Sequence, residues 1–181
     1  AQLYAYNFYE STQSYTELTN ADISTAIGDD GFEDIILPFR FFITYTYPDS
    51  LFSDNLRLFV NGLVQINTPF NSTTNLNDFS NPQIARVLAP FWDDLIADIQ
   101  TEIKYKTVGD YPERIFIVEW KNILAANGRM NFQLWLFEED FSFEFHYGNM
   151  QPANTSATIG LKGFTGTFIS ITPNINAYLS D

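Results

Sequence analysis

Several short segments of the chain alternate apolar and polar residues with a period of two. Leu56–Val60, Ile103–Thr107 and Phe141–Tyr147 are the clearest, and this is the period of a β-strand with one buried face. In the second segment the alternation places Lys104 and Lys106 on the solvent side. The pattern therefore predicts half-buried strands that cover a shared core.

Other strands are predicted by their apolar content. Arg114–Trp120 is apolar on both faces, which is typical of a central strand. Ile35–Ile43 is too apolar for a surface loop, and Pro38 within it predicts an edge strand or a bulge. Leu3–Tyr9 and Tyr15–Leu18 predict two short strands near the N-terminus.

Turn residues separate these segments. Asn61-Gly62 lies between two apolar runs and predicts a hairpin with a type I′ turn, in which both central residues need positive φ. Asp29-Asp30-Gly31 is another turn signal. The segment 68–82, rich in Asn, Ser and Thr, predicts the longest loop.

Many short strands without helical periodicity predict an all-β protein. We expect a single domain over residues 1–181, folded as a jelly-roll-like antiparallel β-sandwich with about ten or more strands and little helix. Leu88–Leu95 combines Phe91 and Trp92 with the adjacent Asp93 and Asp94. Large aromatics anchor cores, so we expect this stretch at a strand end, with Asp93 bound internally and Asp94 in solvent.

Charge and composition narrow the classes of function. The formal net charge of −13 disfavours binding to nucleic acid or to an anionic membrane. The absence of cysteine excludes disulfides, thiolate zinc sites and cysteine nucleophiles. No apolar run reaches the roughly 18 residues of a transmembrane helix.

Seven motifs in order resemble a module of secreted and cell-surface proteins from Bacteroidetes, related to the extracellular domain first named in nidogen (the NIDO domain). The motifs are Asp29-Asp30-Gly31, Val60-Asn61-Gly62, Leu88–Leu95, Arg114–Trp120, Phe132–Phe137, Phe143–Gly148 and Thr158–Leu161, and they span about 29–172. The resemblance implies an exported β-rich module, often part of a larger adhesin-like protein. The family has no agreed catalytic residues, so none is transferred.

Candidate catalytic groups are few. His146 is the sole histidine, so a Ser-His-Asp triad would have to use it. It falls on the outer face of an alternating strand without a nucleophile motif, which favours a surface histidine. Paired carboxylates could hydrolyse glycosides, but the sequence singles out no pair. We therefore expect no catalytic residues and no enzyme activity.

Acidic clusters raise the question of calcium, which binds six to eight oxygens. The candidates are Asp93, Asp94 and Asp98, together with Asp29 and Asp30. None of them has the spacing of a calcium loop, and Asp also forms turns by bonding its own backbone. The structural interpretation is preferred, with no cofactor expected and calcium as the alternative.

Tryptophans could provide a platform that stacks on sugars. Trp92, Trp120 and Trp135 each lie in an apolar run, which favours the core, while Tyr4, Tyr9 and Tyr111 are as plausible for a glycan contact. The leading hypothesis is a non-enzymatic secreted or surface-attached module for adhesion, display or protein interaction. A carbohydrate-binding module, with or without structural calcium, is the alternative, and a glycoside hydrolase-like enzyme is third. The expected partner is a protein or glycan at the cell exterior.

Overall fold

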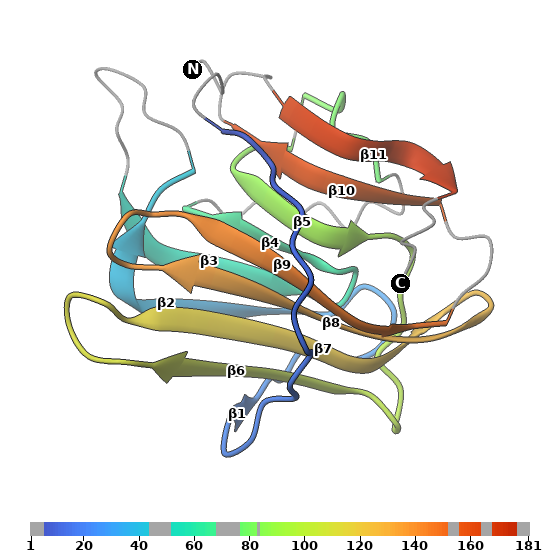
Figure 1. The fold of residues 1–181 in the computed structure, drawn as a ribbon. Helices are drawn as coiled ribbons and strands as arrows, with labels where there is room; N and C mark the ends of the chain where they lie inside the picture. The colour runs from blue at the N-terminus through green and yellow to red at the C-terminus, as the bar shows by residue number, and fades with distance from the viewer. Residues whose placement is uncertain are drawn as a thin grey trace.

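Two antiparallel sheets face each other in a computed structural model that describes residues 6–43, 52–67, 77–82, 84–151, 156–163 and 168–176 (Figure 1). Eleven strands and no helix are assigned within these residues, as the alternation predicted. The five-stranded sheet has the order β1 (Asp22–Ile23), β6 (Glu102–Val108), β7 (Ile115–Ala125), β8 (Gly128–Phe137) and β9 (Phe143–Met150). The six-stranded sheet has the order β11 (Phe168–Asn176), β10 (Ser156–Lys162), β5 (Val87–Trp92), β4 (Leu63–Ile66), β3 (Ser53–Phe59) and β2 (Phe32–Phe41). The fold is an antiparallel β-sandwich.

Apolar side chains from the two inner faces form the main core. Trp120 on β7 has no exposed surface, stacks on Phe132 with ring centroids 5.0 Å apart, and donates its indole N–H to the carbonyl of Phe59 at 2.9 Å. Tyr147 on β9 donates its hydroxyl to the carbonyl of Pro90 on β5 at 2.7 Å. Both bonds join one sheet to the other, and the predicted burial of Trp120 is confirmed.

The hairpin at Asn61-Gly62 is confirmed, but its turn differs from the prediction. Phe59 pairs with Leu63, which leaves three residues in the loop, and only Gly62 has positive φ (73°). Three-residue hairpin loops place one residue in the left-handed region. The side chain of Asn61 instead accepts the backbone N–H of Leu95 at 3.0 Å, so tertiary contacts select the longer turn.

Pro38 lies in β2, which forms one edge of the six-stranded sheet. The regular pairing of β2 with β3 is interrupted between Ile36 and Phe41. A proline cannot donate a hydrogen bond to the ladder, so an irregular edge is where it is tolerated. The edge or bulge predicted from the sequence is confirmed.

A second, smaller core cluster covers part of the outer face of the six-stranded sheet. Trp92 is buried there against Phe79, with ring centroids 5.6 Å apart. Lys162 is also buried, and its ammonium donates to the carbonyls of Phe79 at 2.5 Å and Asn81 at 2.6 Å. Of the long predicted loop, residues 68–76 lie outside the described part of the chain, and the residues after them cover this cluster.

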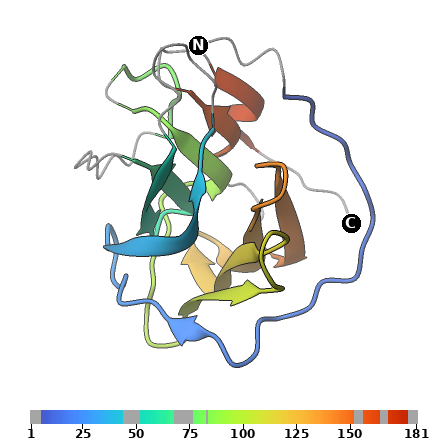
Figure 2. The ribbon, with the colours of Figure 1, turned by 90° about the vertical axis from the view of Figure 1, so that its left-hand side faces the viewer.

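The N-terminal strands predicted at Leu3–Tyr9 and Tyr15–Leu18 are wrong for the residues that the structure describes. Residues 6–21, called the strap below, are irregular and cross the outer face of the five-stranded sheet (Figure 2) before the chain forms β1 at its edge. Residues 3–5 lie outside the described part. The alternating Tyr6 and Phe8 contact the rings of Phe143 and Phe145 instead of joining a ladder. Aromatic packing therefore explains a pattern that resembles a strand.

Candidate functional site: a polar row beneath the strap

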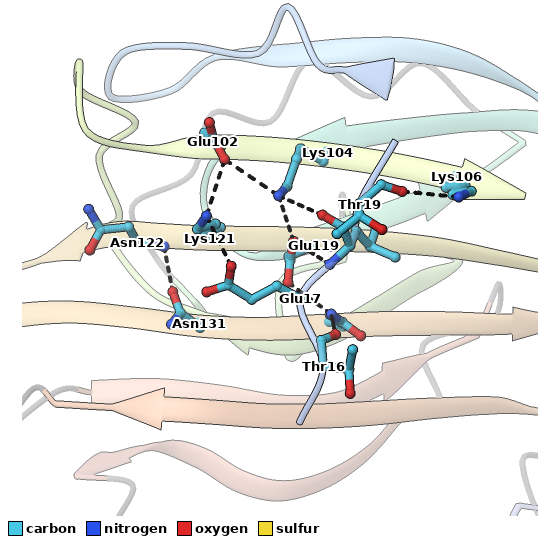
Figure 3. Close-up of polar contacts among 12 residues, drawn as sticks. Thr16, Glu17, Thr19, Glu102, Lys104, Lys106, Glu119, Lys121, Asn122 and Asn131 are labelled. Carbon is cyan, nitrogen blue, oxygen red and sulfur yellow. Dashed lines mark hydrogen bonds and ion pairs between the residues drawn. The ribbon is translucent and has the colours of Figure 1, made fainter. Parts of the chain in front are cut away.

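A line of polar side chains crosses four strands on the outer face of the five-stranded sheet. Lys104 on β6 is paired with Glu119 on β7, Glu119 with Gln133 on β8, and Gln133 with His146 on β9. Directly paired residues lie on the same face, so these four residues, called the polar row below, point outward together. The strap passes over the row at Lys104 and Glu119 (Figure 3), and Gln133 also contacts it.

Glu119 is the centre of the polar row and has no exposed surface. One carboxylate oxygen accepts the hydroxyl of Tyr15 at 2.8 Å and the side-chain amide of Gln133 at 2.9 Å. The other accepts the backbone N–H of Leu18 at 3.1 Å and lies 3.1 Å from the ammonium of Lys104. Burial, followed by the charge of Glu119, raises the pKa of Tyr15. Four donors thus satisfy a carboxylate that would otherwise be costly to bury.

Lys104 corrects an expectation from the sequence, because only 8% of its side chain is exposed. Besides Glu119, its ammonium donates to the carbonyl of Leu18 at 3.0 Å and lies 3.4 Å from Glu102. Alternation placed it on the outer face correctly. That face is covered by the strap, so facing outward does not mean facing solvent.

The row binds the strap mainly through the strap's own backbone. Gln133 donates to the carbonyl of Thr16 at 2.8 Å, and Lys106, which lies beside the row on β6, donates to the carbonyl of Thr19 at 3.0 Å. Together with the two bonds at Leu18, these contacts hold the backbone of the strap at Thr16, Leu18 and Thr19. A side-chain pair adds to them, because the ammonium of Lys121 lies 3.0 Å from Glu17 (Figure 3).

His146 ends the row beside an aromatic neighbour. Its imidazole stacks on Trp135 with centroids 4.3 Å apart, and its Nε2 lies 2.7 Å from a carboxylate oxygen of Glu144. The predicted outer-face position of His146 is confirmed, although only 14% of its side chain is exposed. Trp135 was expected in the core but is half-buried on the outer face, because Leu134 and Leu136 take the inward positions of β8.

The acidic calcium candidates lie near one end of the sandwich but are divided in their contacts. Asp98 forms a bidentate pair with Arg129 at 2.5 and 3.0 Å, which holds the pKa of Asp98 well below its usual range. Asp30 accepts the side-chain amide of Asn61 at 3.0 Å. Among the described residues no three Asp, Glu, His or Cys side chains are arranged to hold a metal ion.

Asp93 and Asp94 differ as the sequence predicted. Asp93 is half-buried and accepts the backbone N–H of Asp94 at 3.0 Å, with further bonds from Ser156. Burial raises the pKa of Asp93 in spite of these bonds. Asp94 is exposed, and burial followed by the charges of Asp29 and Asp30 raises its pKa. The carboxylates of residues 29, 30 and 94 therefore lie close together and give this end of the sandwich a negative electrostatic potential.

Comparison with known proteins identifies the family. A family model described as "NIDO related" matches residues 5–180. The chain belongs to the NIDO-related family. No curated protein and no solved structure matches it. Within the described residues of this NIDO-related domain, no helix is long and apolar enough to cross a bilayer.

The polar row of the NIDO-related domain was not recognised from the sequence. The residue that could have indicated it is Glu119, a carboxylate within the segment Arg114–Trp120, which is otherwise apolar on both faces. A buried carboxylate needs donors, and Lys104 and Gln133 lie 15 and 14 residues away along the chain. Only the pairing register brings them together.

Proposed function

We propose that this NIDO-related domain is a non-enzymatic, secreted or surface-attached module for protein interaction. The observation that supports this most is that the carboxylate of Glu119, which has no exposed surface, binds four donors of the same chain. A general base needs a free lone pair within reach of substrate. Glu119 has donors on both oxygens, so it serves the fold.

Other groups suited to catalysis are engaged in the same way. Asp98 is bound by Arg129, and His146 lies between Glu144 and the ring of Trp135. Glycoside hydrolysis needs two carboxyls facing one bond, one of them able to donate a proton. The internal partners of these residues argue against such a role and favour a binding function.

Exposed isoleucines at the acidic end suggest where a protein partner would bind. Mutual backbone bonds between Gly28 and Ala97 place residues 27–29 beside 96–98. Ile27, Ile96 and Ile99 are 72%, 39% and 100% exposed there, next to the carboxylates of residues 29, 30 and 94. Exposed apolar groups with polar surroundings mark interaction sites. The charge makes a basic protein surface the fitting partner.

The carbohydrate-binding alternative has less support. Trp92 and Trp120 are buried, and one face of Trp135 is covered by His146. Of the tyrosines considered for a glycan contact, Tyr9 and Tyr111 are 87% and 79% exposed, and Tyr4 lies outside the described residues. Substitution of either exposed tyrosine therefore tests the carbohydrate-binding alternative.

The test is binding of the purified domain to an array of immobilised extracellular proteins and glycans. We expect protein binding that weakens with salt, falls about tenfold or more in Ile27→Ser/Ile99→Ser, as at an interface hot spot, and persists in Tyr111→Ser. Tyr111 is a suitable control because it lies beyond the opposite end of β6 from Ile99: Ile99 precedes the start of the strand and Tyr111 follows its end. Glycan binding abolished by Tyr9→Ser or Tyr111→Ser would instead support a carbohydrate-binding module.

A further inference from the structure

We propose that the polar row is also an intermolecular site, which binds the strap of a second copy of this chain. The inference rests on the proposed function only in assuming that the module acts through protein contacts. Most of the polar contacts that hold the strap are made to its backbone. Gln133, Glu119 and Lys104 bind the backbone at Thr16 and Leu18, and such contacts form equally well with a strap from another molecule.

Side-chain contacts select which segment can bind. The ring of Tyr15 lies directly over Gly148, where an added Cβ would be 2.8 Å from the ring. The hydroxyl of Tyr15 reaches Glu119 at 2.8 Å, and two residues later Glu17 pairs with Lys121 at 3.0 Å. A second copy carries this tyrosine and glutamate at the required spacing. It is therefore the occupant that the site fits.

The exit of the strap allows an exchange. Thr19 is bound by Lys106 on β6, next to the two-residue strand β1 at the sheet edge. Asn20 follows with φ of 52°, in the left-handed region that Asn adopts more readily than most non-glycine residues, as in turns. A change of Asn20 to an extended conformation would direct the strap past the edge. A strap arriving from a neighbouring copy would enter over the same edge.

The energetics make exchange dependent on protein concentration. A strap bound in trans forms the same contacts as one bound in cis, which is the basis of domain swapping. Attachment to its own chain gives the strap an effective concentration on the order of millimolar. The monomer therefore dominates in dilute solution, and exchange becomes significant where copies are crowded, as on a surface.

Cysteine variants test the proposal cleanly because the chain has no cysteine. Tyr15→Cys and Gly148→Cys are prepared as separate full chains, mixed at high concentration and oxidised. The Gly148→Cys chain disfavours its own Tyr15 ring, so its row is open to the other strap. The control is a mixture of Tyr111→Cys with Gly148→Cys. The thiol of Tyr111→Cys is exposed on the loop after β6, so this mixture measures disulfide formation by random collision.

We expect about tenfold more disulfide-linked heterodimer from the Tyr15→Cys mixture than from this control, because docking holds the two thiols together. The double variant Tyr15→Cys/Gly148→Cys, oxidised in dilute solution, checks that both substitutions fold and meet. A closed disulfide in that chain with no excess heterodimer would show that the row serves its own strap only. Failure of both disulfides would refute the docking geometry. Either result overturns the exchange and leaves array binding by the wild type unaffected.

Discussion

Replacing Lys104 with methionine tests whether the polar row is a buried ion-pair network. The substitution keeps the length of the side chain but removes an ammonium 3.1 Å from Glu119 and 3.0 Å from the carbonyl of Leu18. Glu119, with no exposed surface, would keep its charge and lose its cation. Breaking a buried pair from one side typically costs about 3–5 kcal/mol. The three remaining donors to Glu119 favour the lower end, about 3 kcal/mol.

The matched control is Lys106→Met, two residues further along the same face of β6. Its ammonium donates to the carbonyl of Thr19 at 3.0 Å in a more exposed position, so its loss should cost about 1 kcal/mol or less. Urea unfolding at pH 7, followed by tryptophan fluorescence, measures both free energies of unfolding. Equal losses for Lys104→Met and Lys106→Met would show that water replaces the ammonium and that the polar row is not closed to solvent.

Four further outcomes are expected. Trp120→Ala should lower the unfolding free energy by about 3–5 kcal/mol, because the side chain is fully buried; an unchanged urea midpoint would place it at the surface. Gly62→Ala should lower the melting temperature more than Gly28→Ala: both glycines have positive φ, but an added Cβ would lie 2.0 Å from a backbone oxygen at Gly62 and meet nothing within 4 Å at Gly28. Asp93→Asn should raise the melting temperature at pH 7, because burial raises the pKa of Asp93 and disfavours its charged form. This gain should vanish below about pH 4, where the carboxyl of the unfolded chain is also protonated. A gain that does not depend on pH would show that the charge of Asp93 is not the cause. Burial raises the pKa of Tyr6 to about 12, so its contribution to stability is complete below about pH 10 and is lost as the pH rises further; thermal melts of Tyr6→Phe should decline less steeply over that range than those of the wild type.

Local patterns were sufficient for most of the sandwich. The alternation in Ile103–Thr107 and Phe141–Tyr147 identified strands, because side chains on a pleated strand change face at every residue. Asn61-Gly62 located the hairpin and Pro38 located the irregular edge. In each case the conformation depends on a few neighbouring residues, so it can be predicted from the sequence alone.

The alternation with a period of two was misleading where aromatic side chains pack without β-sheet pairing of their backbone. Tyr6 and Phe8 alternate as in a strand, yet they belong to the strap and contact the rings of β9. Trp135 was placed in the core because its run is apolar, whereas the register of β8 turns it outward. Period and apolar content describe the two faces of a strand, but they do not say what covers each face.

The candidate site was decided by tertiary structure. Lys104, Glu119 and Gln133 belong to three different strands, and only the pairing of β6, β7 and β8 aligns them. Asp98 was grouped with Asp93 and Asp94 by sequence, but Arg129, 31 residues away, binds it instead. Charges interact over a few ångströms in space whatever their distance along the chain. The sequence therefore predicted most of the strands, and the pairing and packing of those strands determined which charges meet.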